Sequence, residues 1–287
     1  MRRTLYYFFF LTSFGLMMGA CKKHILPGIG HGGVPGEPQA PTETDPPVFA
    51  PVAQRISQNV GGYYAALPAR YQESDFEYPL MVFYHGGGQY GNGGSDLYKV
   101  LQDAVPKLLD EQKFPPSFTV NGRAFSFIII APQLAKSPTI ADTDTLVQYL
   151  KQHYRVNTKR IYLVGFSLGA RFLSDYAAAH PDSIASIVSM GGLPQINGAL
   201  AAKCEGMVKA KLPIWHFHNM NDSAWYYSEA QRYVEVLRGF NPQVYPRFTS
   251  FEFGMARLNH DCWTRASDPA YREENKNIYE WMLQYSR

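Results

Sequence analysis

Charge of either sign is scarce in this chain of 287 residues. Charged side chains make up 18% of it, and 27 Lys and Arg against 24 Asp and Glu leave a formal net charge of +3. The basic runs are short, such as Arg2 with Arg3 and Lys22 with Lys23. A nucleic-acid-binding surface needs a clustered basic patch, so nucleic acid is excluded as a partner. The apolar fraction of 46% excludes a disordered chain.

Cysteines are few and nucleotide-binding motifs are missing. Three cysteines cannot form a disulfide scaffold. The glycines at 86–88 are followed neither by a Gly-Lys-Ser/Thr phosphate loop nor by a G-x-G-x-x-G that opens a helix. His216 and His218 alternate on one predicted strand, but without a third ligand nearby we favour structural burial over a metal site. We therefore expect neither a metal nor an organic cofactor.

The apolar run near the start of the chain is too short to span a bilayer comfortably. Residues 5–18 make a run of 14, whereas a membrane helix needs about 20. The run follows two arginines and ends in MGAC at 18–21, which resembles the cleavage site of bacterial lipoproteins. We expect a signal peptide at 1–20 and lipidation of Cys21, which would anchor the protein to a bacterial membrane, in the periplasm or at the outer membrane. If Cys21 is incidental, the protein is secreted.

Proline and glycine crowd the next segment. Residues 27–47 hold six Pro and five Gly and show no apolar periodicity, a composition typical of a flexible linker. No internal repeat or second hydrophobic pattern follows. We therefore expect a tether at 21–49 and one folded domain at 50–287.

From residue 50 onward, short apolar strands alternate with longer amphipathic stretches. This alternation predicts an α/β fold with a mainly parallel sheet and helices on both faces. The predicted strands lie at 59–66, 80–84, 125–131, 160–164, 184–189, 213–217 and 248–253, and the predicted helices at 95–110 with Ser95 as N-cap, 139–154, 168–180, 227–238 and 271–285. The short connection between the strands at 184–189 and 213–217 leaves no room for a large lid domain.

A nucleophile motif follows the predicted strand at 160–164. Residues 165–169 read GFSLG, a G-x-S-x-G pentapeptide with a strand before it and a helix after it. Glycines permit the tight turn, which lifts Ser167 Oγ clear of the backbone at a helix N-terminus. The pentapeptide alone is common, but this strand-turn-helix context indicates a serine nucleophile.

A glycine-rich turn follows the strand at 80–84. Residues 85–88 read HGGG, and such a turn can hold backbone N–H groups in place for the oxyanion of acyl transfer. The N–H groups of Gly87 and Leu168 are the candidate donors, with Gly88 as a third. A plain tight turn is the alternative reading.

The base and the acid are assigned by chain order, which in this fold runs Ser, acid, His. His260 is the histidine that follows the last predicted strand. Asp222 lies just beyond the carboxyl end of the strand at 213–217. Asp261, next to the base, is better placed to orient the loop than to act as the acid. We therefore predict a triad of Ser167, His260 and Asp222.

These motifs together resemble a known family. Residues 79–285 are similar to bacterial carboxylesterases of the α/β-hydrolase superfamily, in the group of esterases and predicted peptidases related to polyhydroxybutyrate depolymerase-like and feruloyl or acetyl-xylan esterase-like enzymes. The matching pieces are PLMVFYHGGG at 79–88, VPKLL at 105–109, IAPQ at 130–133, the Ser167 pentapeptide and NHDCW at 259–263.

The chain departs from this family at two places. The family often carries Glu-Arg after the glycine turn, where this chain has Gln89 and Tyr90, and His-Gly-x-x-Asp at the acid loop, where it has Asn219 after His218. The spacing to Asp222 is kept. The resemblance implies a serine esterase that acts on a small or polysaccharide-linked ester.

Two further features bear on substrate and stability. Trp225 and Tyr226 follow the acid and Trp263 follows the base, so their rings could form a substrate platform; packing of the loops is an equally good reading. In an oxidising compartment Cys204 and Cys262 could pair.

Two other functions stay open at this point. A serine peptidase would share the triad and the fold, although no propeller domain that selects oligopeptides is found in the sequence. A non-catalytic carbohydrate-binding lipoprotein would keep the aromatic platform and lose the triad.

Overall fold

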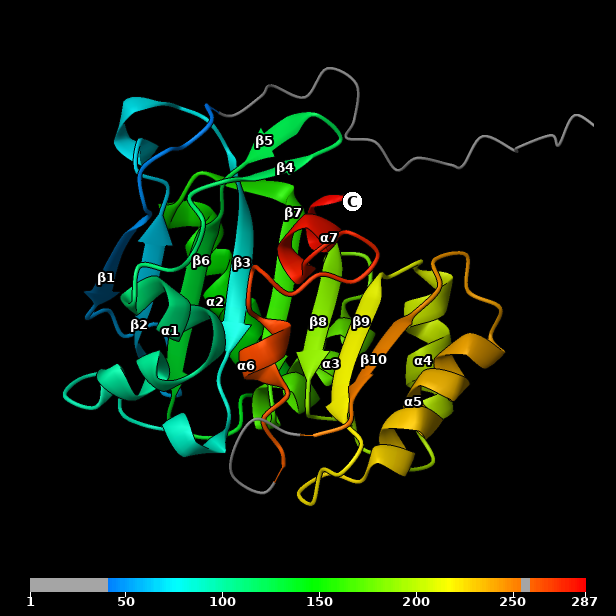
Figure 1. Cartoon of the computed structure of the whole chain (residues 1–287). Helices are drawn as coiled ribbons and strands as arrows, with labels where there is room; N and C mark the ends of the chain where they lie inside the picture. The colour runs from blue at the N-terminus through cyan, green and yellow to red at the C-terminus, as the bar shows by residue number, and fades with distance from the viewer. Residues whose placement is uncertain (1–40, 254–258) are drawn as a thin grey trace, which may run out of the picture. The chain divides into compact units, whose positions relative to one another are not determined.

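The computed structural model describes residues 41–253 and 259–287, and these contain an eight-stranded sheet in the order β1-β2-β6-β3-β7-β8-β9-β10 (Figure 1). The predicted signal peptide at 1–20, the lipidation site Cys21 and the tether up to residue 40 lie outside the described residues.

The strands are β1 (Val48–Val52), β2 (Val60–Leu67), β3 (Tyr78–Tyr84), β4 (Phe118–Val120), β5 (Arg123–Phe125), β6 (Ile128–Leu134), β7 (Val156–Phe166), β8 (Ser186–Met190), β9 (Ile214–Asn219) and β10 (Arg247–Phe251). The α-helices are α1 (Ala104–Asp110), α2 (Ile140–His153), α3 (Leu168–Ala179), α4 (Leu200–Lys209), α5 (Tyr227–Gly239), α6 (Trp263–Ala266) and α7 (Ile278–Leu283). Three short 3₁₀ turns are η1 (Tyr71–Glu73), η2 (Gly87–Gln89) and η3 (Leu97–Gln102).

The sheet is parallel from β6 onward, and its central strands are buried on both faces. β1 and β2 pair antiparallel at one edge, whereas β6, β3, β7, β8, β9 and β10 pair parallel. All seven residues of β3 and all seven of β6 are buried, which explains their continuous apolar sequence. The predicted α/β fold with a mainly parallel sheet is confirmed.

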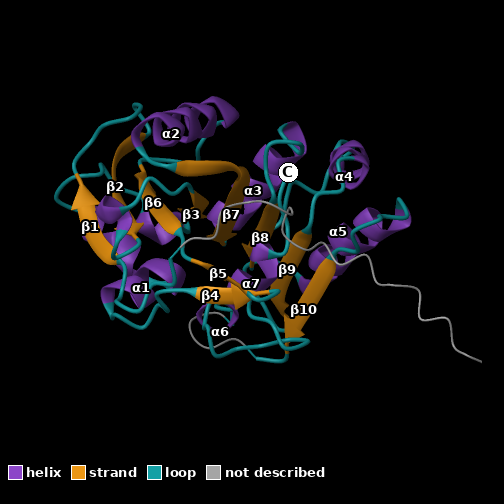
Figure 2. Ribbon diagram, turned by 90° about the horizontal axis from the view of Figure 1, so that it is seen from above, coloured by secondary structure: helices purple, strands orange, loops and turns teal. Residues whose placement is uncertain are grey.

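Each face of the sheet has its own hydrophobic core. One core includes apolar residues of α2, α3, α4 and α5, and the other those of α1, α6, α7 and the β4–β5 hairpin. Figure 2 shows these two layers on either side of the sheet. Because parallel strands end at the same edge of a sheet, the loops after β3, β7 and β9 meet there.

The predicted helix at 95–110 is wrong in one respect, because it is broken at Asp103. η3 ends at Gln102 and α1 begins at Ala104, while Asp103 is extended with φ −141° and serves as the N-cap residue of α1. Ser95 caps neither element. Ala104 has φ +51°, a left-handed conformation that is unfavourable for a residue with a Cβ.

The predicted helix at 271–285 is also too long. α7 begins only at Ile278, where Asn277 and Glu280 form a capping box. The segment before it includes the isolated bridge between Glu273 and Lys276. Sequence periodicity missed β1, the β4–β5 hairpin, α4 and α6. β1, β4, β5 and α6 have five residues or fewer, too few to show a period.

The folded domain begins earlier than the predicted boundary at residue 50. β1 already starts at Val48 and pairs with β2. Glu43 is 2% exposed, and its Oε2 accepts hydrogen bonds from the backbone N (3.2 Å) and Nε (3.4 Å) of Arg70. The boundary prediction failed because proline-rich composition does not exclude an edge strand, whose outer side needs no partner.

The proposed pairing of Cys204 with Cys262 is contradicted. Both cysteines are free and buried. Cys204 belongs to the core on the α3 side of the sheet and Cys262 to the core on the α6 side. The sheet therefore separates the two sulfurs, beyond the reach of a disulfide.

Replacing Glu43 should destabilise the domain. Glu43→Ala leaves the Arg70 backbone N–H without its acceptor, so we expect a loss of about 1–3 kcal/mol in the free energy of unfolding. Urea denaturation measures it, with the exposed Asp45→Ala as the matched control. Equal midpoints for the two variants would contradict the role assigned to Glu43.

Candidate active site

Ser167 lies in a strained turn between β7 and α3. Its backbone has φ +52° and ψ −122°, an unfavourable conformation for a non-glycine residue. Gly169 lies so close to β3 that a Cβ there would be 2.3 Å from Tyr84 O. A Cβ at Gly165 would be 2.9 Å from the same oxygen. The two glycines of the pentapeptide are therefore required for α3 to start beside the end of β3.

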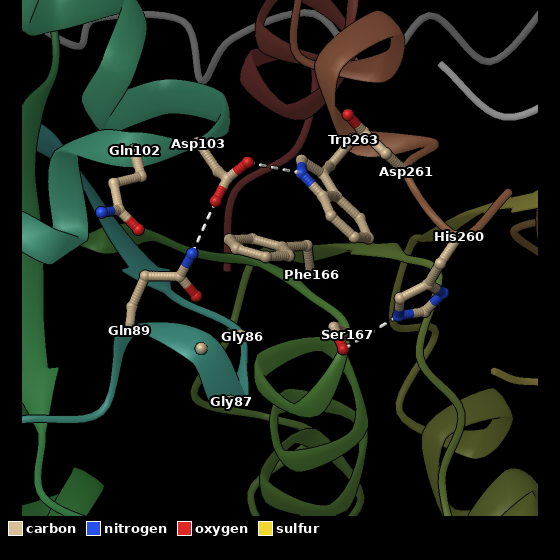
Figure 3. A pocket seen from close by; sticks show the side chains of 11 residues that line it. Gly86, Gly87, Gln89, Gln102, Asp103, Phe166, Ser167, His260, Asp261 and Trp263 are labelled. Carbon is tan, nitrogen blue, oxygen red and sulfur yellow. Dashed lines mark hydrogen bonds between the residues drawn. The ribbon is translucent and has the colours of Figure 1, made fainter. Parts of the chain in front are cut away.

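The structure brings the three predicted triad residues together. Ser167 Oγ lies 3.0 Å from His260 Nε2, and His260 Nδ1 lies 2.7 Å from Asp222 Oδ2. Figure 3 shows the serine and the imidazole pointing toward each other. The side chain of His260 is 13% exposed and that of Asp222 is fully buried. This order, hydroxyl to imidazole to buried carboxylate, is the arrangement that activates a serine.

Asp222 is held by its own loop. Its Oδ1 accepts hydrogen bonds from the backbone N–H groups of Ala224 (2.8 Å) and Trp225 (2.9 Å). His218 Nε2 lies 3.5 Å from Asp222 Oδ2 and donates to Trp225 O at 2.9 Å. One oxygen of the carboxylate is thus engaged by the backbone while the other faces His260.

Two further histidines lie behind the acid, on β9. His216 and His218 are fully buried, and burial lowers the pKa of both imidazoles. His216 Nδ1 hydrogen-bonds to Ser189 Oγ at 2.7 Å. Ser189 and His216 are 0% exposed, so this second serine–histidine pair is closed to any substrate. Within the described ranges, no group of three or more His, Cys, Asp or Glu is placed to hold a metal ion.

The glycine turn lies beside Ser167, as the oxyanion prediction requires. Gly87 opens η2, and a Cβ on it would lie 2.8 Å from Leu168 Cδ1. Leu168 is the first residue of α3, so its N–H has no acceptor within the helix. Gly87 and Gly88 line the same cavity as Ser167. The glycine turn and the first turn of α3 therefore lie side by side at the cavity that Ser167 lines.

A cavity of about 740 Å³ opens at Ser167. Its walls carry two aromatic rings, Phe166 and Trp263, with ring centroids 4.4 Å apart. Figure 3 shows these rings between Ser167 and the polar side chains of Gln89 and Asp103. The lining residues are Gly86, Gly87, Gly88, Gln89, Gln102, Asp103, Phe166, Ser167, His260, Asp261 and Trp263.

Only one of the three predicted platform residues lines this cavity. Trp263 does, and its ring meets that of His260 edge-on with centroids 5.0 Å apart. Trp225 packs against the core on the α3 side, with the Arg171 guanidinium 5.7 Å from its ring. Tyr226 is 68% exposed. The platform interpretation is therefore restricted to Trp263 and its neighbour Phe166.

Three site residues were not singled out from the sequence for the roles they have. Gly191, with φ +62°, lies against the histidine loop, since a Cβ there would be 3.3 Å from both His260 O and Cys262 Sγ. Asn219 Nδ2 donates to Asn259 O at 2.7 Å and so ties the acid loop to the histidine loop. Asp103 bonds both Gln89 and Trp263. The glycine pair at 191–192 after a strand was a usable signal, whereas Asp103 offered none.

Asp261 has the loop-orienting position that was predicted. Its carboxylate accepts from Thr264 N at 2.9 Å and from Thr264 Oγ1 at 2.7 Å. These bonds fix the first turn of α6 directly after His260.

Comparisons with known proteins agree with the fold described above. A family model described as alpha/beta hydrolase fold matches residues 79–280. A bifunctional acetylxylan esterase/xylanase of Neocallimastix patriciarum is 29% identical over 160 residues, which is 56% of this chain and 22% of that protein. The chain thus spans less than a quarter of that relative.

Solved structures share the fold at low sequence identity. A thermostable esterase matches 84% of this chain and 63% of its own, with 19% identity and a TM-score of 0.57. A ferulic acid esterase of the anaerobic fungus Anaeromyces mucronatus matches 88% of this chain and 95% of its own, with 18% identity and a TM-score of 0.53.

Acid should destabilise the folded domain through His85. This buried ring donates from Nδ1 to Gly86 O, and its Nε2 accepts from Leu134 N–H at 2.9 Å. Burial lowers its pKa from 6.5 to about 4. Between those values the unfolded chain binds the proton and the folded chain does not, so stability falls as the pH falls from about 6.5 to 4.

We expect His85 alone to account for about 2 kcal/mol of lost stability between about pH 7 and pH 5. Urea unfolding of wild type and His85→Gln at both pH values measures this, and the variant should lose less on acidification. His153→Gln, at an exposed position, is the control. The same pH dependence in wild type and in His85→Gln would contradict the prediction.

Proposed function

Because the chain belongs to the α/β-hydrolase fold family, we propose that it is a serine hydrolase that cleaves carboxylic esters. One observation carries the proposal. The chain of contacts from Ser167 Oγ through His260 to Asp222 lies at a cavity, beside a glycine turn that can supply oxyanion donors. This combination of nucleophile, base, orienting acid and oxyanion donors defines acyl transfer.

Each residue then has one role. His260 Nε2 takes the proton from Ser167 Oγ as this oxygen attacks the ester carbonyl carbon. Asp222 holds the imidazole and stabilises its cation. His260 next gives the proton to the leaving alcohol, which departs as the carbonyl re-forms in an acyl-enzyme. Water repeats the sequence, releases the acid and restores Ser167.

The developing oxyanion would be bound by backbone N–H groups of Gly87 and Leu168, with Gly88 as a third. One such donor typically contributes about 3 kcal/mol to the stabilisation of the transition state. The helix dipole of α3 adds to this, because its N-terminus faces the same point.

The acyl group of the substrate can be proposed more closely than its alcohol part. The similarity to a protein described as an acetylxylan esterase favours acetyl esters on a polysaccharide as first candidates. The aromatic pair Phe166 and Trp263 could carry a sugar or an aromatic ring. A panel of acetylated sugar, feruloyl and p-nitrophenyl acyl esters, with peptide amides for comparison, addresses this.

Ser167→Ala should abolish the activity. We expect no labelling by a fluorophosphonate probe and a fall of at least about 10⁴-fold in ester hydrolysis, because the nucleophile is gone. Ser189→Ala is the matched control, since that buried serine also bonds a histidine, and it should still be labelled. Labelling of Ser167→Ala equal to wild type, or no labelling of wild type, would refute the serine-hydrolase proposal.

We also propose that the enzyme is exported and held at a bacterial membrane by lipid on Cys21. The described residues include no helix that is both long and apolar enough to cross a membrane. Cys21→Ala should abolish incorporation of a labelled fatty acid and release the protein from the membrane fraction. Incorporation that persists in Cys21→Ala would contradict lipidation at this residue.

A further inference from the structure

One carboxylate connects the two loops that flank the cavity. Asp103 Oδ2 accepts a hydrogen bond from Gln89 Nε2 at 2.5 Å, and Asp103 Oδ1 accepts one from Trp263 Nε1 at 3.2 Å. Figure 3 shows both bonds on the wall opposite Ser167 and His260. Asp103 thus bonds both the glycine turn, 14 residues before it in the sequence, and the histidine loop, 160 residues after it.

On one side Asp103 holds the glycine turn through Gln89. Gln89 is the last residue of η2 and is only 6% exposed. Its backbone N–H donates to Gly86 O at 3.3 Å, and its backbone O accepts from Gln133 Nε2 at 3.0 Å. Gln89 Oε1 is buried with no hydrogen-bond partner among the described residues. An ionised carboxylate can only accept hydrogen bonds, so the Gln89 amide must turn its NH₂ group toward Asp103. This orientation leaves Gln89 Oε1 unbonded, and Asp103 therefore sets it.

On the other side Asp103 holds the indole ring of Trp263, which lies beside His260. Trp263 is the first residue of α6 and is 8% exposed. Its ring meets His260 edge-on and packs over Phe166, the residue before Ser167. A displaced indole would therefore disturb the imidazole directly.

The backbone around Asp103 is built to present this carboxylate. Asp103 interrupts what would otherwise be one helical stretch, and Ala104 takes φ +51° to start α1. Such strain persists only where the surroundings fix it, and it is concentrated at functional sites.

We propose that Asp103 is a positioning residue that fixes the oxyanion turn and the His260 loop relative to each other. The inference rests on the proposed function. Oxyanion donors must lie about 2.7–3.1 Å from the developing charge while the base stays in reach of the serine. Two charge-assisted bonds from one carboxylate hold both distances together. Their loss should therefore lower kcat and leave KM nearly unchanged.

A three-residue mutant cycle tests the connection, because Gln89 and Trp263 act on each other through Asp103. Gln89→Met and Trp263→Phe each remove one donor, and we expect each to lower kcat for p-nitrophenyl acetate about tenfold. The pair together should also lose about tenfold. In an Asp103→Ala background neither change should lower kcat further by more than about twofold. Effects that multiply to about a hundredfold, or an Asp103→Ala variant with wild-type kcat, would overturn the inference.

A spectroscopic readout covers the case in which Asp103→Ala folds poorly. The chain has four Trp, so its indole N–H signals can be assigned by NMR. Gln89→Met should shift the Trp263 signal in the presence of Asp103, and the shift should be lost in Asp103→Asn, which presents one acceptor oxygen in place of two. A shift of equal size in both backgrounds would refute transmission through the carboxylate.

The matched control is Asp96→Ala. Asp96 bonds Asn92 N and Lys99 Nζ in the preceding turn and does not line the cavity, so kcat should stay at the wild-type value. Fluorophosphonate labelling separates the two levels of the hypothesis. A wild type that is not labelled refutes the proposed function, whereas a labelled wild type with multiplicative variants refutes only the role of Asp103.

Discussion

The close approach of α3 to the end of β3 is the constraint on which the whole site depends. A Cβ at Gly169 would lie 2.3 Å from Tyr84 O and 2.7 Å from His85 O, which is possible for no other residue type. This contact brings the first turn of α3 against the glycine turn. It also forces the turn at Ser167 into the left-handed region, because the chain must reverse between β7 and a helix packed on its neighbour.

Burial divides the histidines of this edge into two kinds. His85, His216 and His218 are enclosed, and burial lowers the pKa of each. Enclosed neutral rings serve as fixed hydrogen-bond partners of backbone and side chains. His260 differs from these three because its ring is partly exposed and lies on the cavity. Histidine therefore fixes loops where it is enclosed, and in His260 it presents an accessible ring nitrogen to Ser167.

The parts of the site that the sequence predicts are those tied to strand ends. Ser167, Asp222 and His260 could be found because chain order and strand position restrict each to few choices. Asp103 could not, since it falls within an amphipathic stretch whose periodicity suggests an unbroken helix. At this break Asp103 bonds two residues outside the predicted helix, Gln89 and Trp263, and local patterns do not contain such contacts.

The same limit explains the cysteines and the aromatic platform. Cys204 and Cys262 are both buried, but residue type does not reveal which face of the sheet each one enters. Trp225 and Trp263 follow triad residues at similar spacing, yet one packs on the core and the other lines the cavity. Tertiary packing decided both outcomes, because the register of a loop on a sheet edge is not encoded by spacing alone.

The bond to Asp103 explains why this chain has a neutral amide at Gln89. Chains of the kind this sequence resembles often carry Glu there. Gln89 Nε2 lies 2.5 Å from Asp103 Oδ2. A glutamate at position 89 would place a second carboxylate against Asp103, and two like charges that close repel each other. The neutral amide converts the repulsion into a bond. Tyr90 adds a second tie, because its hydroxyl lies 2.8 Å from Ser137 Oγ. In this chain the glycine turn is therefore held by the Gln89–Asp103 and Tyr90–Ser137 bonds.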